Sequence, residues 1–232
     1  MTLAQDTKQL ANPRDKLKFQ IDQPVEDRDW LAFFRDLYLG FGPPDELILR
    51  CVRRAYRDFN RTWHGARDPA GRRNEVRGAA EVAIVDALTA LRVAELGQSG
   101  FDRWHSVAMK AVMSATDPES RGTGLTLGQA QKWINMSVKY VVGGRVDGFD
   151  WVEAFAHVPI DRILIAQIEQ HPDLRTIIDT LPPGAWSKLT DESAYLAFQK
   201  GLRNIVSPLI PLSVEFRLWS TAVRSLGNRT RF

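Results

Sequence analysis

The sequence predicts an all-α fold, and three observations favour this class. Apolar residues recur at intervals of three and four along most of the chain, which is the periodicity of amphipathic helices. No segment shows the sustained alternation of apolar and polar residues that is typical of a strand. Glycine and proline gather at a few positions between the periodic segments, such as 43–44, 143–144 and 182–184. We therefore expect about nine or ten helices.

The N-terminal half of the chain is expected to hold four helices. Residues 1–25 are polar and lack periodicity, so we predict a flexible N-terminal arm, followed by one helical domain over 26–232. A loop between the second and third helices carries Trp63, and a loop rich in helix breakers follows the fourth. The predicted helices are 27–38, 45–59, 75–96 and 101–115.

The C-terminal half continues with helices separated by proline and glycine. The first runs over 129–142 and ends at Gly143, and a connection then leads to a helix that starts after Asp161. That helix is expected to stop at Pro172, because the residue before a proline is disfavoured in the helical conformation. Further helices are predicted over 173–181, 192–206 and 211–226.

Composition limits the class of protein. The chain has 232 residues, of which 44% are hydrophobic and 25% charged, as is usual for a soluble globular protein of one or two domains. It contains neither an apolar run of ~18–20 residues nor a signal-peptide pattern, so we expect an intracellular protein that does not enter a membrane. The single cysteine, Cys51, excludes an internal disulfide and a cysteine-ligated cluster. The four histidines show no metal-binding spacing, so we predict neither metal nor cofactor.

The charge permits nucleic-acid binding without requiring it. The net charge is +3 and the pI is about 9.1, but the arginines are unevenly distributed. A basic surface of clustered arginines can follow a phosphate backbone, although a solvated helix face is an equally good interpretation. The clustered arginines are Arg50, Arg53, Arg54, Arg57, Arg61, Arg67, Arg72 and Arg73.

The segment T-L-G-Q-A-Q-K, residues 126–132, leads into the helix that the middle of the chain is built around. Its first turn has free N–H groups that can bind an anion, and Lys132 stands beside them. Lys132, Met136 and Lys139 form a stripe away from the apolar face that contains Trp133 and Val138. A solvated lysine is the simpler interpretation, because lysine is rarely buried.

A second motif lies downstream, where V-P-I-D occupies residues 158–161. An aspartate before a helical pattern is first of all an N-cap, which stabilises a helix by about 1 kcal/mol. Together, however, the two motifs resemble the helix-hairpin-helix superfamily of DNA glycosylases, in which L-P-G-V-G-x-K opens a helix and V-P-V-D follows. Gly128 matches the first glycine, Ala130 replaces the second, Lys132 falls on the lysine of the bifunctional members, and Asp161 falls on the catalytic aspartate.

Within that superfamily, the chain is most similar to the archaeal 8-oxoguanine DNA glycosylase branch. Lys132 and Asp161 are 29 positions apart, and Lys139 matches a second lysine of that branch. Glu215 and Trp219 match an acidic residue and a tryptophan that border its base pocket, although core packing is an alternative role for Trp219. The clear similarity covers about residues 122–168. Leu127, Ala130 and Arg162 depart from the pattern.

The resemblance implies a fold, a function and a set of site residues. The fold would place two helical subdomains on either side of a cleft. The function would be excision of a damaged base, with 8-oxoguanine as the best candidate, through a Schiff base on Lys132 that Asp161 assists, with AP-lyase activity. The base pocket would include Lys139, Met136, Glu215, Trp219 and, without a motif, Trp63. The DNA backbone would be bound by Gly128, Gln129, Ala130 and Arg121.

Three alternatives stay open at this point. The same scaffold could excise a modified base from foreign phage DNA as a defence enzyme, because specificity resides in pocket residues. It could also be a helical nucleic-acid-binding module without catalysis, or a helical scaffold in which Lys132 and Asp161 are only a surface charge and a helix cap. In the glycosylase interpretation the partner is double-stranded DNA that carries a damaged or modified base. The protein would then be a monomer in the cytoplasm, associated with the nucleoid.

Overall fold

The computed structural model describes residues 26–63, 72–117 and 124–229, and within these ranges the chain is helical and contains no strand. This confirms the predicted all-α class. None of the described helices is both long enough and apolar enough to cross a membrane. The α-helices are α2 (Asp27–Leu39), α3 (Leu47–Phe59), α4 (Arg72–Arg92), α5 (Gln98–Thr116), α6 (Leu127–Gly143), α7 (Arg162–Glu169), α8 (Pro172–Arg175), α9 (Glu192–Val206) and α10 (Pro211–Arg229). The 3₁₀ turns are η1 (Pro44–Glu46), η2 (Asn60–Thr62), η3 (Asp150–Ala154), η4 (Ile178–Thr180) and η5 (Trp186–Lys188).

The chain divides into two compact units, residues 1–41 and 42–232. Among described elements, the first unit contains α2 alone. A capping box between Glu26 and Asp29 begins this helix, and Gly40 ends it with a φ of 91°, which residues other than glycine rarely adopt. The division therefore falls after α2. The predicted flexible arm, residues 1–25, lies outside the described residues.

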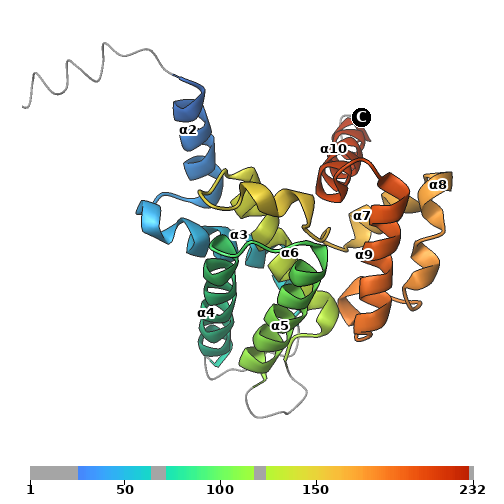
Figure 1. Ribbon diagram of the computed structural model, residues 1–232, viewed down its shortest axis with the longest axis horizontal. Coiled ribbons are helices and arrows are strands. Elements are labelled where there is room, and N and C mark those ends of the chain that lie inside the picture. The colour runs from blue at the N-terminus through green and yellow to red at the C-terminus, as the bar shows by residue number, and fades with distance from the viewer. Residues whose placement is uncertain (1–25, 64–71, 118–123, 230–232) are drawn as a thin grey trace, which may run out of the picture. The chain divides into compact units, whose positions relative to one another are not determined.

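The second unit consists of two groups of helices (Figure 1). Helices α3 to α6 pack on one another in the first group, and α7 to α10 pack in the second. Helix α6 also contacts η3 and η5, and α10 contacts η3 as well as α7 and α9. Residues of α6, α10 and the segment before α7 are therefore close enough to form a shared site.

Helix α6 is surrounded by protein on nearly every side. All twelve residues from Leu127 to Val138 are buried, because α3, α5 and η5 cover different faces of the helix. Such a helix has no solvent face for a polar side chain. The expectation that Lys132 points away from the buried side is therefore wrong, since Lys132 is only 4% exposed.

The start of α6 shows why Gly128 is glycine. The helix begins at Leu127, with Thr126 as N-cap in a capping box with Gln129, so Gly128 lies in the first helical turn. A Cβ atom at Gly128 would lie 1.9 Å from the carbonyl oxygen of Trp186 in η5. The glycine is needed for this close approach of two backbones, and its backbone conformation is helical.

Candidate active site

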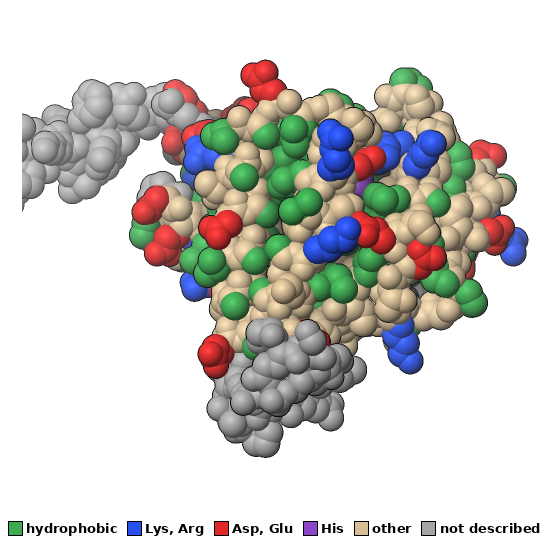
Figure 2. Space-filling model, turned by 60° about the horizontal axis from the view of Figure 1, so that its bottom comes forward, with side chains coloured by type: hydrophobic (Ala, Val, Ile, Leu, Met, Phe, Trp, Pro, Cys, Tyr) green, Lys and Arg blue, Asp and Glu red, His purple; other side chains and the backbone are tan. Residues whose placement is uncertain are grey.

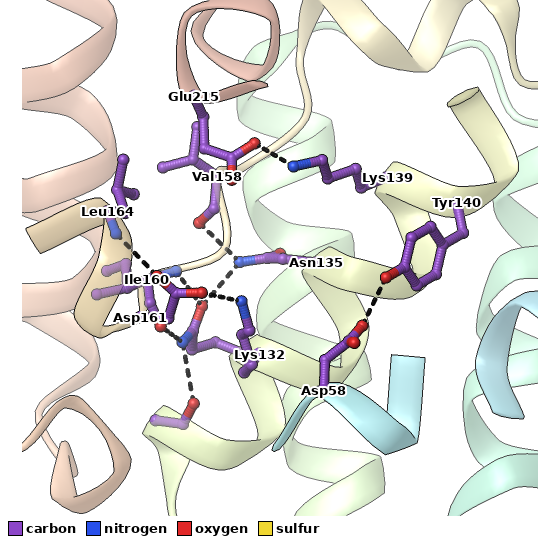
Figure 3. A network of polar contacts seen from close by, with 12 residues as sticks. Asp58, Lys132, Asn135, Lys139, Tyr140, Val158, Ile160, Asp161, Leu164 and Glu215 are labelled. Carbon is purple, nitrogen blue, oxygen red and sulfur yellow. Dashed lines mark hydrogen bonds and ion pairs between the residues drawn. The ribbon is translucent and has the colours of Figure 1, made fainter. Parts of the chain in front are cut away.

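Lys132 of α6 and Asp161, the N-cap of α7, meet side by side although they are far apart in the sequence. Lys132 Nζ donates to Asp161 Oδ2 at 2.5 Å, and the two side chains are 5% and 17% exposed (Figure 3). The other carboxylate oxygen, Oδ1, accepts from the backbone N–H of Leu164 at 2.8 Å. A single carboxylate therefore begins α7 and neutralises a buried lysine.

The position of Asp161 follows from the buried segment before it. Residues 156–160 are all buried and cross the side of α6. The Gln131 side chain accepts from the N–H of Ile160 and donates to its carbonyl oxygen, at 3.1 and 2.8 Å. Because Gln131 and Lys132 are neighbours on α6, this contact places Asp161 next to the lysine.

A second charged pair lies further along α6, at the lysine seven residues after Lys132. Lys139 Nζ donates to Glu215 Oε2 of α10 at 2.6 Å, and the two side chains are 15% and 3% exposed (Figure 3). Burial raises the pKa of Glu215, although the adjacent Lys139 acts in the opposite direction. The charges of Lys132 and Asp161 also act on the pKa of Glu215, so the two pairs belong to one electrostatic cluster.

Two aromatic side chains of α10 border this cluster at the surface. The Lys139 ammonium lies 5.6 Å from the ring centre of Trp219 and 5.5 Å from that of Phe216, within the range of a cation–π interaction. Trp219 is 38% exposed and Phe216 is 56% exposed, so neither is a core residue. Phe216 was not among the predicted site residues, because a phenylalanine in an apolar helical stripe is normally assigned to the core.

Met136 lies on α6 between the two lysines. It is 8% exposed, four residues after Lys132 and three before Lys139, so the three side chains lie along one stripe of the helix. The structure therefore brings together five of the predicted catalytic and pocket residues near Met136: Lys132, Asp161, Lys139, Glu215 and Trp219.

Trp63 does not join them as a surface for stacking. It is 2% exposed, and its ring meets the Tyr56 ring edge-on at 6.5 Å. Tyr56 in turn packs on Phe59 and Trp133, so Trp63 is part of an aromatic core between α3 and α6. The burial of Trp63 does not support the predicted stacking on a base, since the ring has no open face in this structure.

The backbone N–H groups expected to bind phosphate are used within the protein. Gly128 donates to the Leu189 carbonyl oxygen at 2.9 Å, and Gln129 and Ala130 donate to the side chain and the carbonyl oxygen of Thr126. All three residues are buried. Phosphate binding by Gly128, Gln129 and Ala130 is therefore not supported by this structure. Arg121 lies outside the described residues.

The clustered arginines are only partly free to meet a partner. Arg50 is buried, and Arg53 and Arg54 pair with Glu81 and Asp58. Arg57 and Arg61 are exposed, and Arg67 lies outside the described residues. On the face drawn in Figure 2, Lys and Arg are interspersed with acidic and apolar side chains rather than gathered in one patch.

The described residues contain no group of three or more His, Cys, Asp or Glu side chains able to hold a metal ion. Comparisons of the chain with protein-family models, with curated proteins and with solved structures found no match. A function for the site must therefore be argued from its geometry and from the two sequence motifs.

Proposed function

We propose that this chain is a DNA glycosylase with AP-lyase activity, which extrudes a damaged base from the duplex and releases it through a Schiff base on Lys132. The observation that carries the proposal is the contact between the Lys132 amine and the Asp161 carboxylate, next to a second pair formed by Lys139 and Glu215. This combination joins a candidate nucleophile, a carboxylate and a second pair of charged side chains in one place.

The energetic cost of this arrangement supports a chemical role. Removing an ion pair from water costs several kcal/mol per ion, and apolar residues of similar volume are often as stable or more stable at such positions. Two pairs are nevertheless buried within two turns of α6, in a helix that is otherwise covered by protein. Clusters of buried charges of this kind are enriched at functional sites.

The reaction can be written with the residues present. Lys132 transfers a proton to the Asp161 carboxylate and attacks C1′ of the extruded nucleotide, so that an N–C1′ bond forms. The glycosidic bond breaks, its electron pair leaves with the base, and the base takes the proton from Asp161. The carboxylate that is restored stabilises positive charge on the sugar. A second proton then moves from the nitrogen to O4′ as the C1′–O4′ bond opens, which leaves a protonated imine between Lys132 and C1′ that permits strand scission by β-elimination.

The second pair and the aromatic residues would select the base. Extrusion costs a few kcal/mol, and stacking on an aromatic side chain recovers ~1–3 kcal/mol per base. Trp219 and Phe216 provide aromatic surface, Lys139 can donate to a carbonyl oxygen, and Glu215 can accept from an N–H group. An edge with a carbonyl oxygen beside an N–H group would match this pair. 8-Oxoguanine presents such an edge at O8 and N7–H, besides the O6 and N1–H edge that it shares with guanine, and is the first candidate substrate.

Borohydride trapping tests the reaction class directly. The wild-type protein, incubated with a lesion-containing duplex and borohydride, should give a covalent protein–DNA adduct. Lys132→Gln should abolish the adduct in a protein that circular dichroism shows to be folded. Lys139→Gln is the matched control, which should slow trapping without preventing it, because Lys139 contacts the base and not the sugar.

The duplexes should carry 8-oxoguanine, uracil, an alkylated purine or a bulky modified cytosine in otherwise identical sequences. An adduct with the modified cytosine alone would assign the protein to foreign DNA. Trapping in Lys132→Gln but not in Lys139→Gln would show that the nucleophile is assigned to the wrong lysine. If the folded protein binds duplex DNA but no lesion gives an adduct, a binding module replaces the enzyme as the best interpretation.

A further inference from the structure

A buried polar cluster lies behind the candidate active site and takes no part in the reaction proposed above. Two of its residues, Gln131 and Asn135, lie four apart on α6, and two others, Tyr195 and Gln199, lie four apart on α9. Residues spaced by four share a helix face. All four are at most 2% exposed. We call these four residues the clamp.

The clamp holds the backbone that precedes Asp161. Gln199 accepts from the Val158 N–H at 3.0 Å and donates to the Val158 carbonyl oxygen at 2.9 Å, which also accepts from Asn135 at 3.1 Å. Gln131 bonds both polar groups of Ile160. Buried backbone groups need hydrogen-bond partners, and here side chains from two helices supply them where a neighbouring strand usually would.

The Tyr195 hydroxyl joins the two halves of the clamp through a chain of hydrogen bonds. His105 Nε2 lies 2.7 Å from Asn135 Oδ1, and His157 Nδ1 lies 2.9 Å from Tyr195 Oη. Asn135 Nδ2 donates to Tyr195 Oη at 3.0 Å, and His157 Nε2 lies 2.8 Å from Asp102 Oδ1. The chain therefore runs from His105 through Asn135, Tyr195 and His157 to Asp102.

The acceptor atoms at the two ends of this chain set the direction of donation along it. An amide oxygen and a carboxylate oxygen only accept, so His105 and His157 each carry a proton on Nε2. Neutral His157 then accepts on Nδ1 from the Tyr195 hydroxyl. Burial lowers the pKa of both histidines, which keeps them neutral. His105 Nδ1 is buried without a hydrogen-bond partner among the described residues, so a proton on this nitrogen would have no acceptor there.

We propose that the clamp positions the Asp161 carboxylate against the Lys132 amine. The residue after Ile160 is Asp161, so a shift of the held segment moves the carboxylate directly. A displacement of about 1 Å at a reacting group can cost ~100-fold in rate. Gln131, Asn135, Tyr195 and Gln199 are thus positioning residues. Their effect on the reaction rate rests on the proposed function, whereas their effect on the position of the Asp161 carboxylate is independent of it.

The first test follows Asp161 without any reaction. The Leu164 N–H donates to Asp161 Oδ1, so its hydrogen exchange reports the place of the carboxylate. Gln199→Met keeps the side-chain volume and removes both bonds to Val158, and Tyr195→Phe removes only the hydroxyl. Both should accelerate exchange at Leu164 by about 10-fold or more. Tyr140→Phe is the control, since its hydroxyl bonds Asp58 on the other side of α6.

The second test measures chemistry in the same proteins. Single-turnover trapping per folded molecule should fall by about 10- to 100-fold in Gln199→Met and Tyr195→Phe, with DNA affinity within about 2-fold of the wild type. Tyr140→Phe should trap at the wild-type rate. Nitrogen NMR of the wild type should show His105 and His157 as neutral Nε2–H tautomers.

Three results would overturn the inference. One is unchanged exchange at Leu164 in both clamp variants. Another is an Nδ1–H tautomer at His157, which contradicts the direction of the chain. The third is wild-type trapping rates in clamp variants whose exchange is accelerated. If the wild-type protein itself gives no adduct, the proposed function fails, while the exchange and tautomer results still decide whether the clamp holds Asp161.

Discussion

Replacing Asp161 with asparagine separates the two contacts of one carboxylate. In the structure Oδ1 accepts from the Leu164 N–H and Oδ2 accepts from Lys132. An amide has one acceptor atom and one donor group, so the asparagine side chain cannot replace both carboxylate oxygens. If its oxygen keeps the helix cap, its NH₂ group faces the lysine ammonium. The capping side chain is retained, yet the buried lysine loses its partner.

The size of the expected loss of stability in Asp161→Asn follows from the burial of the ion pair with Lys132. Removing one member of a buried ion pair typically costs ~3–5 kcal/mol, because the remaining charge is unpaired, whereas loss of an N-cap costs only about 1 kcal/mol. Asp161 is 17% exposed, and the water near it favours the lower end of the first range. We expect a loss of about 3 kcal/mol. In a chain of this size 1 kcal/mol shifts Tm by ~2–4 °C, so Tm should fall by roughly 6–12 °C.

A double-mutant cycle isolates the pair. Thermal and urea unfolding of Asp161→Asn, Lys132→Met and the double variant should show that the double variant recovers about 2 kcal/mol of the sum of the single losses, because no unpaired charge is left. Base release by Asp161→Asn should fall by orders of magnitude in the protein that stays folded. Additive stability losses together with wild-type base release would refute the reasoning, since Asp161 would then be only a cap.

Three further outcomes are expected. Trp219→Ala should weaken binding to lesion-containing duplex by ~1–3 kcal/mol and leave undamaged duplex unchanged, measured by fluorescence anisotropy. Because burial raises the pKa of Glu215 above its usual 4.5, the folded state is disfavoured as the pH rises through that folded pKa. Urea unfolding at several pH values should therefore show the stability difference between the two proteins moving in favour of Glu215→Gln as the pH rises above 4.5, even though the variant lacks the ion pair with Lys139. Gly128→Ala should lower the free energy of unfolding by ~1–3 kcal/mol or more, because the alanine Cβ would overlap the Trp186 carbonyl oxygen.

Helix periodicity predicted the class and most of the elements, because apolar spacing reflects which face each helix buries. It predicted boundaries less well. The helix expected at 75–96 runs over Arg72–Arg92, and the helix expected at 173–181 is a single turn, α8, followed by η4. The same method failed for the polar residues of α6. Periodicity assigns lysine, glutamine and asparagine to solvent, whereas Lys132, Gln131 and Asn135 are buried because other elements cover nearly every side of this part of α6.

The sequence predicted the site residues whose positions depend on a motif. It did not predict those whose positions depend on packing between distant helices. The V-P-I-D motif made Asp161 an N-cap, and the structure shows that cap. The proximity of Lys132 and Asp161 followed from the resemblance, since nothing in the local sequence joins residues so far apart. The burial of Trp63 depends on an aromatic cluster with Tyr56, and Tyr195 lies on a helix of ordinary composition, so neither role had a signal in the sequence.

The burial of Lys132 constrains how the proposed enzyme would choose its base. With 5% of its side chain exposed, the amine cannot reach a sugar until the site opens. Helix α10 contacts α7, which Asp161 caps, and is tied to α6 by the Lys139–Glu215 bond, so an opening movement of α10 would break that bond. A base with a carbonyl oxygen beside an N–H group can supply both replacements. Any other base leaves Lys139 or Glu215 buried without a partner, which costs ~1–3 kcal/mol or more for a charged group. The groups that would recognise the base would therefore keep the site closed to bases without such an edge, such as adenine and cytosine, whereas guanine, thymine and uracil also carry a carbonyl oxygen beside an N–H group.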